Sequence, residues 1–347
     1  MSSQAPVSDL SRDTSLFRLL QAAAGEQRAQ FVFETLEMAP ALCASRGSRQ
    51  SIDRAQIAMA LNAVLFCDLL DRVPTAARYV AEQRAKGEAI VLDHGALRTV
   101  DSHSGDLVPG YKGFSRFLEP LGYEVGGLYP LPALKMTGRA LVHRDMPEAI
   151  PQFFVSELHL SELPVAAQGA AARVFGTSRD PIGNDAWTAL EALARDGQID
   201  FDGAVTILRD LVRAFGRQHD VPTLADYETL LEHSREGAWI ATEGNDFNHA
   251  TTRVPDVEQL SQDLRAAGYP MKEAVEISRN GRVRQTAFLA DKVRREFRTE
   301  DGIVTREVPG SFYEFISRDV DADKGALDLT FDSGNATGIF AVTREQA

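Results

Sequence analysis

The spacing of hydrophobic and polar residues divides the chain into helical and strand-rich stretches. Residues 1–88 place apolar side chains at helical spacing, as in AQIAMALNAVLFCDLL, and predict an N-terminal helical region. An apolar run, alternating positions and glycine-containing turns predict strands over residues 89–161. Helical spacing returns over residues 162–240, strand patterns resume over residues 241–318, and residues 319–347 predict a tail.

The two strand-rich stretches contain the same motif. DHGALRTV (93–100) and NHATTRVP (248–255) each place a histidine after a polar residue and an arginine four positions later. At similar distances after the two motifs, a glutamate lies in an aromatic-rich strand pattern: Glu157 in FFVSEL and Glu314 in FYEFIS. Such an internal repeat predicts two copies of one structural unit.

We therefore expect an α+β fold of two pseudo-symmetric β-α-β-β-β modules, with a helical insertion between them and the N-terminal helices completing one compact domain. Modules that pack side by side about a pseudo-twofold axis turn His94 and His249 toward one cavity. In the same arrangement, Glu157 and Glu314 approach that cavity from the last strand of each module.

These side chains are typical metal ligands. Imidazole nitrogen and carboxylate oxygen together suit a divalent first-row transition metal. His94, His249 and Glu314 form a set of two histidines and one carboxylate, which leaves coordination positions open for a substrate and dioxygen. Glu157 is either a fourth ligand or a residue that lies behind the ligands. A single buried histidine is more often a structural core residue, so the metal prediction depends on the repeat.

Arg98 suggests how a substrate is held. It lies four residues after His94, on the same face of the predicted strand and about 13 Å further along it. A guanidinium binds a carboxylate with two parallel hydrogen bonds, which suits a linear dicarboxylate whose other end lies at the metal. A structural salt bridge to Asp93 or Asp101 is the alternative, and Arg253 has the same ambiguity.

Gln285, in the stretch RVRQTAF, is a further candidate polar contact to substrate from a middle strand of the second module. The other histidines lack the repeated context and are interpreted as loop or surface residues: His103, His143, His159, His219 and His233.

Composition limits the classes of partner. The 347 residues include 37 basic and 50 acidic side chains, for a net charge of -13. This balance argues against nucleic acid, because phosphate binding needs clustered Lys and Arg. The N-terminal stretch MSSQAPVSDLSRD lacks the apolar segment of a signal peptide. The most apolar helix is interrupted by Gln56, Asn62 and Asp68, so we expect no membrane span and a cytoplasmic location.

The stretches DHGALRTV, FFVSEL, FNHATTRV, RQTAF and FYEFISR, in this order, resemble the 2-oxoadipate dioxygenase/decarboxylase family over residues 30–318. That family is similar in fold to the vicinal oxygen chelate superfamily, which implies a half-barrel. The resemblance implies Fe(II) as cofactor, held by His94, His249 and Glu314. It also implies that Arg98 binds the distal carboxylate of the substrate.

The implied reaction converts 2-oxoadipate and O2 to 2-hydroxyglutarate and CO2 in lysine catabolism, by oxidative decarboxylation and hydroxylation of the carbon next to the new carboxylate. Two alternatives share the fold. A glyoxalase-type, metal-dependent isomerase or lyase would use four ligands, with Glu157 as the fourth. A small-ligand-binding protein without catalytic activity would bind its ligand without turnover.

Overall fold

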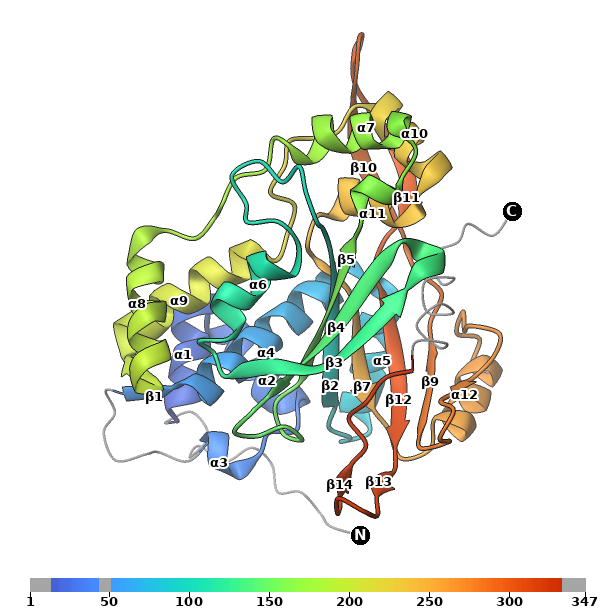
Figure 1. Cartoon of the computed structure of the whole chain (residues 1–347). Helices are drawn as coiled ribbons and strands as arrows, with labels where there is room; N and C mark the ends of the chain where they lie inside the picture. Colours follow the sequence, from blue (N-terminus) through green and yellow to red (C-terminus); the bar gives the residue numbers. More distant parts are fainter. Residues whose placement is uncertain (1–13, 44–50, 333–347) are drawn as a thin grey trace.

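An eight-stranded mixed sheet, curled into a half-barrel, forms the centre of the structure (Figure 1). The computed structural model describes residues 14–43 and 51–332. Across the sheet the strands follow the order β3-β4-β5-β2-β7-β12-β9-β8, which confirms the predicted α+β fold. Their bounds are Val91–Val100 (β2), Tyr123–Leu131 (β3), Met136–His143 (β4), Gln152–Leu158 (β5), Phe247–Arg253 (β7), Glu276–Ile277 (β8), Val283–Ala287 (β9) and Phe312–Arg318 (β12).

Each half of the sheet comes from one β-α-β-β-β module. The first module runs β2-α6-β3-β4-β5, with α6 at Gly110–Leu118, and the second runs β7-α12-β8-β9-β12, with α12 at Val257–Ala266. In each module the first strand pairs in parallel with the last strand. The modules join where β2 pairs with β7 in antiparallel orientation.

The register of that central pairing relates the two modules by a pseudo-twofold axis. Three successive pairs form its middle: His94 with Thr251, Gly95 with Ala250, and Ala96 with His249. If each residue is replaced by its equivalent in the other motif, so that His94 exchanges with His249 and Gly95 with Ala250, the same three pairs result. The pseudo-twofold axis therefore passes between the two strands at the Gly95–Ala250 pair. The two histidines therefore lie at equivalent places on either side of it, as the repeat predicted.

Helices cover one face of the sheet. Leu97, Phe153 and Phe247 point to this face and share a core with helices α1 (Ser15–Ala24), α2 (Glu26–Thr35), α4 (Arg54–Arg72), α5 (Pro74–Ala85), α8 (Asn184–Asp196) and α9 (Phe201–Ala214). Because side chains alternate along a strand, the neighbouring residues face the other side. The N-terminal helices thus share one core with helices α8 and α9 of the insertion, and β1 (Ser51–Asp53) pairs with β6 (Gln198–Asp200) between them.

The long helix α4 begins at a capping box that the sequence encodes. The Asp53 side chain accepts a hydrogen bond from the Gln56 N–H, and the Gln56 side chain accepts one from the Asp53 N–H. Two of the otherwise unpaired N–H groups at the helix start are satisfied in this way. Within the helix, the buried Asn62 donates to the hydroxyl of Tyr123 and so has a partner inside the core.

The remainder of the insertion lies at the opposite end of the sheet. Here α7 (Val165–Phe175), α10 (Leu224–His233) and α11 (Arg235–Glu243) pack together at the end of β2 and β5 where both strands finish (Figure 1). Other short elements of the described chain are α3 (Pro40–Cys43), β13 (Val320–Asp321) and β14 (Ala326–Leu327). Parts of the predicted N-terminal region and tail, residues 1–13, 44–50 and 333–347, lie outside the described residues.

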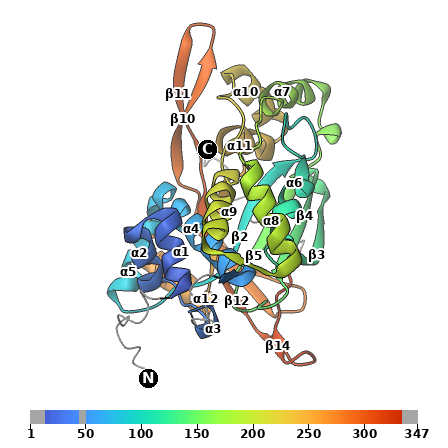
Figure 2. The ribbon, with the colours of Figure 1, turned by 90° about the vertical axis from the view of Figure 1, so that its left-hand side faces the viewer.

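The stretch VRREFRT is a strand, but it does not belong to the main sheet. As β10 (Lys292–Thr299) it pairs with β11 (Gly302–Pro309) in a two-stranded hairpin that extends away from the sheet in Figure 2, and its Arg298 also forms an isolated parallel bridge with Thr223. Its inward residues Phe297 and Val308 pack on α10 and α11 instead. The strand pattern predicted over residues 241–318 thus includes a hairpin outside the main sheet, because these side chains bury against the insertion.

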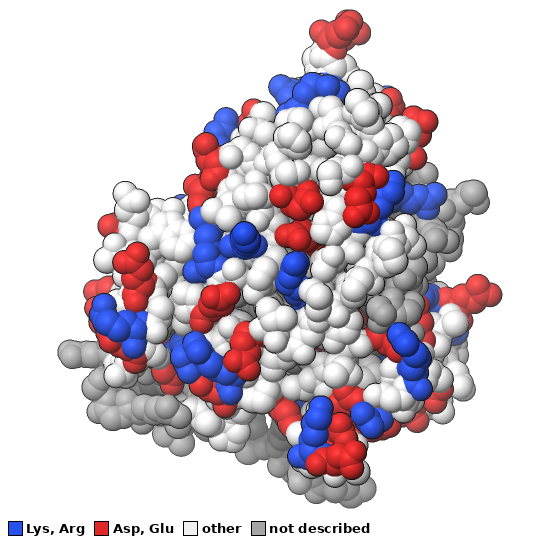
Figure 3. All heavy atoms as spheres, in the orientation of Figure 1, with Lys and Arg blue, Asp and Glu red and all other residues white. Residues whose placement is uncertain are grey.

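Charge is mixed on one face of the molecule. On the face shown in Figure 3, acidic and basic side chains are interspersed, and the acidic excess does not gather in one patch. Among the described helices, none has both the length and the apolar character that crossing a membrane requires.

The close contact at the pseudo-twofold axis makes a prediction for stability. A Cβ on Gly95 in β2 would lie 2.1 Å from the ring of Phe247 in β7. Gly95→Ala therefore forces this ring and its strand to shift, and it lowers the free energy of unfolding by about 1–3 kcal/mol or more. Urea denaturation measures this loss. Gly169→Ala in α7 is the control, since its Cβ finds only the end of the Arg173 side chain, at 3.4 Å, and stability there stays level or rises. Equal stability of the two variants would contradict the prediction.

Candidate metal centre

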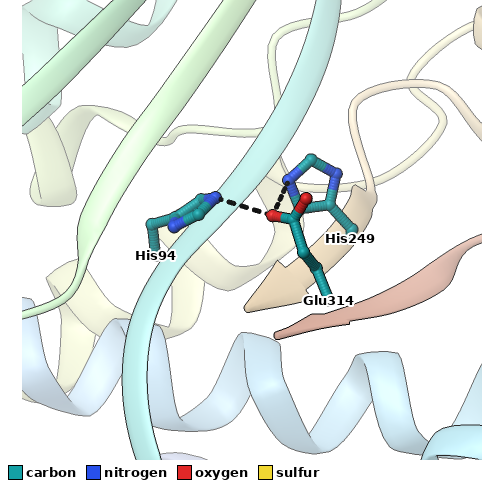
Figure 4. Close-up of side chains that lie close together, drawn as sticks. All are labelled: His94, His249 and Glu314. Atoms are coloured by element: carbon teal, nitrogen blue, oxygen red, sulfur yellow. Dashed lines mark ion pairs between the residues drawn. The ribbon is translucent and has the colours of Figure 1, made fainter. Parts of the chain in front are cut away.

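Three buried side chains meet on the face of the sheet that the helices leave open. His94 from β2, His249 from β7 and Glu314 from β12 each offer one ligand atom, and these atoms all lie within 4.8 Å of one another (Figure 4). The Nε2 atom of His94 lies 3.3 Å from Oε2 of Glu314, and that of His249 lies 3.5 Å from the same oxygen. Among the described residues, this is the one such group of three or more potential ligands.

Strand geometry brings the three together. β7 is the neighbour of both β2 and β12, so the three side chains come from adjacent strands. Glu314 lies opposite Thr251 on β7, two residues after His249 and therefore on the same face. The Thr251 hydroxyl donates to Oε2 of Glu314 at 2.7 Å and lies 3.0 Å from Nε2 of His94.

The outer nitrogen of each imidazole also has a partner. The Nδ1 atom of His94 lies 2.8 Å from Oδ1 of Asp93, and that of His249 lies 3.1 Å from the side-chain amide of Asn248. A carboxylate that accepts from Nδ1 fixes the ring orientation and leaves Nε2 as the ligand atom. Asp93 plays this part for His94, and the Nε2 atoms of both rings face Glu314.

Asp93 is itself held by two arginines. Arg318 on β12 and Arg253 on β7 form ion pairs with its carboxylate, each at 2.9 Å. Burial alone raises the pKa of Asp93, but Arg318 and His94 hold it well below its usual range. Asp93 therefore stays ionised beside His94. The observed partner of Arg253 is thus Asp93, and substrate binding by Arg253 remains a prediction.

The three candidate ligands differ in protonation. Burial lowers the pKa of His249 to about 3, so this ring is neutral. Burial also acts to lower the pKa of His94, but hydrogen bonds to Asp93 and Glu314 raise it above its ordinary value. Burial acts to raise the pKa of Glu314, and the two imidazoles with Thr251 lower it below its ordinary value. These directions favour an ionised Glu314 and a protonated His94, and a proton on Nε2 of His94 must leave before a metal binds there.

A metal ion fits this donor set. The second carboxylate oxygen of Glu314, Oε1, is buried and has no hydrogen-bond partner among the described residues. A buried oxygen without a partner is costly unless something binds it. Two imidazole nitrogens and one carboxylate suit a divalent first-row metal. The arrangement fits the triad that the sequence predicted, while the identity of the metal stays a prediction.

Strand register identifies the residue that takes the place of Glu314 in the first module. Ala96 and Thr251 are equivalent, because each follows its motif histidine by two positions. On the neighbouring parallel strand, Ala96 lies opposite Phe154 and Thr251 lies opposite Glu314. The counterpart of Glu314 is therefore Phe154. The prediction that Glu157 is this counterpart was wrong by three residues. A phenylalanine occupies the position from which a fourth carboxylate would reach the ligand group.

Glu157 has a different contact. Its Oε2 accepts a hydrogen bond of 2.7 Å from the Tyr111 N–H in the first turn of α6, and its Oε1 lies 3.3 Å from Arg139. A Cβ on Gly110 would lie 1.9 Å from the same carboxylate, so only glycine fits there. Glu157 is outside the group of ligand atoms that includes His94.

Aromatic rings line the open side of the group. The ring of Phe331 lies 4.9 Å from that of His94 and 5.1 Å from that of Phe154, and its N–H donates to the hydroxyl of Tyr129. Arg318 holds this segment by donating to the carbonyls of Asp328 and Thr330, while it also pairs with Asp93. These rings cover the His94 side of the group, and His94 is buried.

The predicted polar contacts lie further along the same face. Arg98 is fully buried, with Nε 3.0 Å from Oε2 of Glu236 and its guanidinium 4.8 Å from the ring of Trp239. Gln285 lies opposite Ile316 on β12, two residues after Glu314 and thus on its face. Its amide donates to Glu276 at 3.3 Å. Contact of either residue with a substrate remains a prediction.

Sequence reasoning missed several residues around the group. Asp93 and Thr251 lie within the two motifs and were detectable there, whereas Phe331 and Glu236 are distant in the chain and carry no local signal. Of the histidines interpreted as loop or surface residues, His143 and His219 are buried. The Nε2 atom of His143 is hydrogen-bonded to the backbone carbonyl of Leu121, and that of His219 to the backbone carbonyl of Ala241. Both are therefore core histidines with partners.

The two-module half-barrel has a glyoxalase-like fold, and its buried His-His-Glu group is a candidate metal centre. A model of the 2-oxoadipate dioxygenase/decarboxylase family matches residues 62–328. The chain belongs to that family, which is a family of enzymes.

Solved structures agree with this assignment. A protein from Ralstonia eutropha JMP134, provisionally assigned to the glyoxalase superfamily, is 49% identical over 92% of this chain and 98% of its own, with a TM-score of 0.88. Hydroxyglutarate synthase from Oryza sativa, in complex with 2-oxoadipate, is 20% identical over 86% of this chain and 97% of its own, with a TM-score of 0.65. Hydroxyglutarate synthase from Pseudomonas putida, also in complex with 2-oxoadipate, is 17% identical over 84% of this chain and 74% of its own, with a TM-score of 0.58. These two share the fold. Comparison with curated proteins gives no significant match.

A pair of glutamate variants tests the ligand set. Glu314→Gln removes a charged ligand and should lower metal affinity by more than the ~10–100-fold typical of residues behind the ligands. Glu157→Gln still accepts the Tyr111 N–H and should retain metal like the unsubstituted protein. Metal content after dialysis, measured by elemental analysis, compares them. Loss of metal in both variants would indicate that Glu157 also binds the metal.

Metal affinity should depend on pH because of His94. The proton that Asp93 and Glu314 stabilise on His94 must leave before Nε2 can bind a metal. As pH falls through the raised pKa of His94, affinity therefore decreases, and metal binding releases a growing fraction of a proton, up to one for each ion bound. His249 adds no pH dependence to metal affinity near neutral pH, since its pKa is about 3. Calorimetric titration between about pH 6 and pH 8 in buffers of different ionisation enthalpy measures both effects. Affinity that is constant across this range would contradict the assignment.

Proposed function

We propose that the chain is an Fe(II)-dependent, cytoplasmic dioxygenase/decarboxylase that converts 2-oxoadipate and O2 to 2-hydroxyglutarate and CO2, in lysine degradation. The observation that carries the proposal is the three-ligand set itself. Two histidines and one carboxylate lie together, and Phe154 stands where a fourth ligand would be. This set is typical of non-haem Fe(II) oxygenases, whose open positions take the substrate and O2.

Family membership and the named ligands of the similar structures support the same substrate. The family is that of 2-oxoadipate dioxygenase/decarboxylases, and both hydroxyglutarate synthase structures contain 2-oxoadipate. The four-ligand arrangement of a glyoxalase-type isomerase finds no support in the register, since Glu157 binds the first turn of α6. A dioxygenase is therefore the better proposal.

The reaction is balanced without a further co-substrate. The bond between C1 and C2 of the 2-oxo acid breaks and C1 leaves as CO2. One oxygen atom of O2 enters the new carboxylate at C2, and the other becomes the hydroxyl on the adjacent carbon. Four electrons from the substrate reduce O2. Fe(II), held by His94, His249 and Glu314, would supply the redox chemistry toward O2.

The chain's own residues orient and enclose the reactants. Asp93 holds the His94 ring so that Nε2 faces the substrate side. The rings of Phe154 and Phe331 keep water out, which protects a reactive site from side reactions. Arg98, about 13 Å along the strand from His94, receives the far end of an extended substrate. Fixing both ends of the substrate contributes to the rate by positioning it.

Oxygen consumption tests the function directly. With Fe(II) and 2-oxoadipate, the protein should consume one O2 for each CO2 released, and His249→Ala should abolish both along with iron binding. An oxygen electrode with product analysis by mass spectrometry measures this stoichiometry. Turnover of 2-oxoadipate without O2 uptake would exclude a dioxygenase and favour an isomerase or lyase.

Arg98→Ala should raise the KM for 2-oxoadipate by about tenfold or more with a smaller change in kcat, because a charged hydrogen bond to one substrate group is lost. Removing Arg98 alone leaves Glu236 buried without this cation. The double variant Arg98→Ala/Glu236→Gln avoids that charge and should show the same rise in KM. Unchanged kinetics in both variants would contradict the role of Arg98.

A further inference from the structure

A cavity of about 180 Å³ lies where α10 and α11 meet the base of the β10–β11 hairpin (Figure 1). It is separate from the candidate metal centre, since none of the three candidate ligands lines it. Sites for drug-sized ligands usually measure ~300–1,000 Å³, so this cavity suits a smaller molecule. Two of its lining residues, Leu231 and Arg235, are exposed, and the cavity therefore reaches solvent at its rim.

Most of the lining is aromatic or aliphatic. Tyr227 on α10 and Trp239 on α11 contribute two rings, and Ala238, Val308 and Pro309 add aliphatic surface. Aromatic side chains bind a flat apolar group through offset stacking and edge contacts. The shape and chemistry of these walls therefore favour a ligand that contains an aromatic ring.

Arg235 gives the rim a positive charge. It is the first residue of α11, and it forms no ion pair with any residue that the structure describes. Among the described lining residues there is no aspartate or glutamate, and the adjacent Glu236 is paired with Arg98 instead. The partial positive charge at the start of a helix acts in the same direction as the guanidinium. An anionic group is therefore the favoured partner at this rim.

Trp239 connects the cavity with Arg98. Its ring lines the cavity and lies 4.8 Å from the guanidinium of Arg98, and its Nε1–H donates to the carbonyl of Gly310 at 3.1 Å. A cation over an indole ring is attracted most strongly where both are desolvated, and both of these side chains are buried. A ligand that packs on the indole restricts the motion of the ring and thereby holds the guanidinium in place.

We propose that this cavity is a second small-molecule site that takes an aromatic monocarboxylate, and that its occupation tightens the binding of the dicarboxylate substrate at Arg98. The aromatic ring packs against Tyr227 and Trp239, and the carboxylate binds Arg235. The effect on the substrate rests on the proposed function, in which Arg98 holds the far carboxylate. The second site itself does not depend on that function.

Tryptophan fluorescence measures binding at this place. The chain has two tryptophans, Trp187 and Trp239, so Trp187→Phe leaves Trp239 as the only one. In the Fe(II)-loaded protein kept without O2, benzoate should change the emission of Trp239 saturably. Benzamide has the same shape without the charge and should bind about two- to fivefold more weakly, the usual effect of an exposed ion pair. Arg235→Gln should weaken benzoate binding by the same factor and remove the difference between the two probes.

Two further variants separate this cavity from other places of binding. Ala238 lines the cavity and is 1% exposed, so Ala238→Leu fills the space and should abolish the saturable change. Arg294→Gln is the matched control for the charge. Arg294 is also exposed, but it lies on β10 three residues before Phe297, and its side chain therefore leaves the hairpin on the face away from α10 and α11. This variant should bind benzoate like the unsubstituted protein.

Calorimetry measures the connection between the two sites. With saturating benzoate and without O2, the dissociation constant of 2-oxoadipate should fall about fivefold, at the low end of coupling between two sites. Because such coupling is reciprocal, saturating 2-oxoadipate should tighten benzoate binding by the same factor. Ala238→Leu should remove both effects.

The possible outcomes are distinct. Benzoate that is displaced by 2-oxoadipate, with an affinity that Arg235→Gln and Ala238→Leu leave unchanged, binds at Arg98 and overturns the second site. Equal affinity for benzoate and benzamide overturns the role of Arg235, and this comparison needs no variant of the cavity. Benzoate binding that leaves the affinity for 2-oxoadipate unchanged overturns the coupling and supports the site. The binding measurements require no turnover, so a lack of O2 uptake would refute the proposed function without bearing on the second site.

Discussion

The antiparallel pairing of β2 with β7 is the constraint on which the candidate site depends. Because the strands meet about a pseudo-twofold axis at Gly95, each motif histidine lies one pair from that axis and both rings reach the same face. β12 then adds Glu314 from the next strand. On the opposite face, the ring of Phe247 lies against Gly95 so closely that no other side chain fits. Packing on the covered face therefore determines the geometry of the ligands on the open face.

Asp93 connects this geometry to the rest of the molecule. Its carboxylate holds the ring of His94, and Arg318 joins it to the last strand of the second module and to the segment before Phe331. A buried ion pair does not by itself add stability, because desolvation offsets much of the attraction. Its effect here is positional. One carboxylate fixes a ligand, links the two modules and anchors the segment that places an aromatic ring over the site.

The backbone is nearly symmetric, but the chemistry is not. Glu314 faces the ligand group, while the equivalent place in the first module belongs to Phe154. The two motif arginines also differ: Arg253 turns to Asp93, whereas Arg98 meets Glu236 from the inserted helices. These differences arise because different segments of the chain pack against the two modules. A repeated fold thus yields one asymmetric site, with candidate ligands at one end and a charged pair at the other.

The sequence by itself determined the two-module fold and the three candidate ligands, because a repeated motif and strand alternation are local properties. Alternation establishes which residues of one strand share a face, so the two histidines and Glu314 could be assigned from the motifs. Only the tertiary structure decided that Phe154, and not Glu157, is the counterpart of Glu314, since register between strands depends on the loops and packing that join them. The same holds for Glu236 beside Arg98 and for the hairpin of β10 and β11. These contacts join segments far apart in the chain, and their side chains carry no periodic signal that reveals which partner they meet.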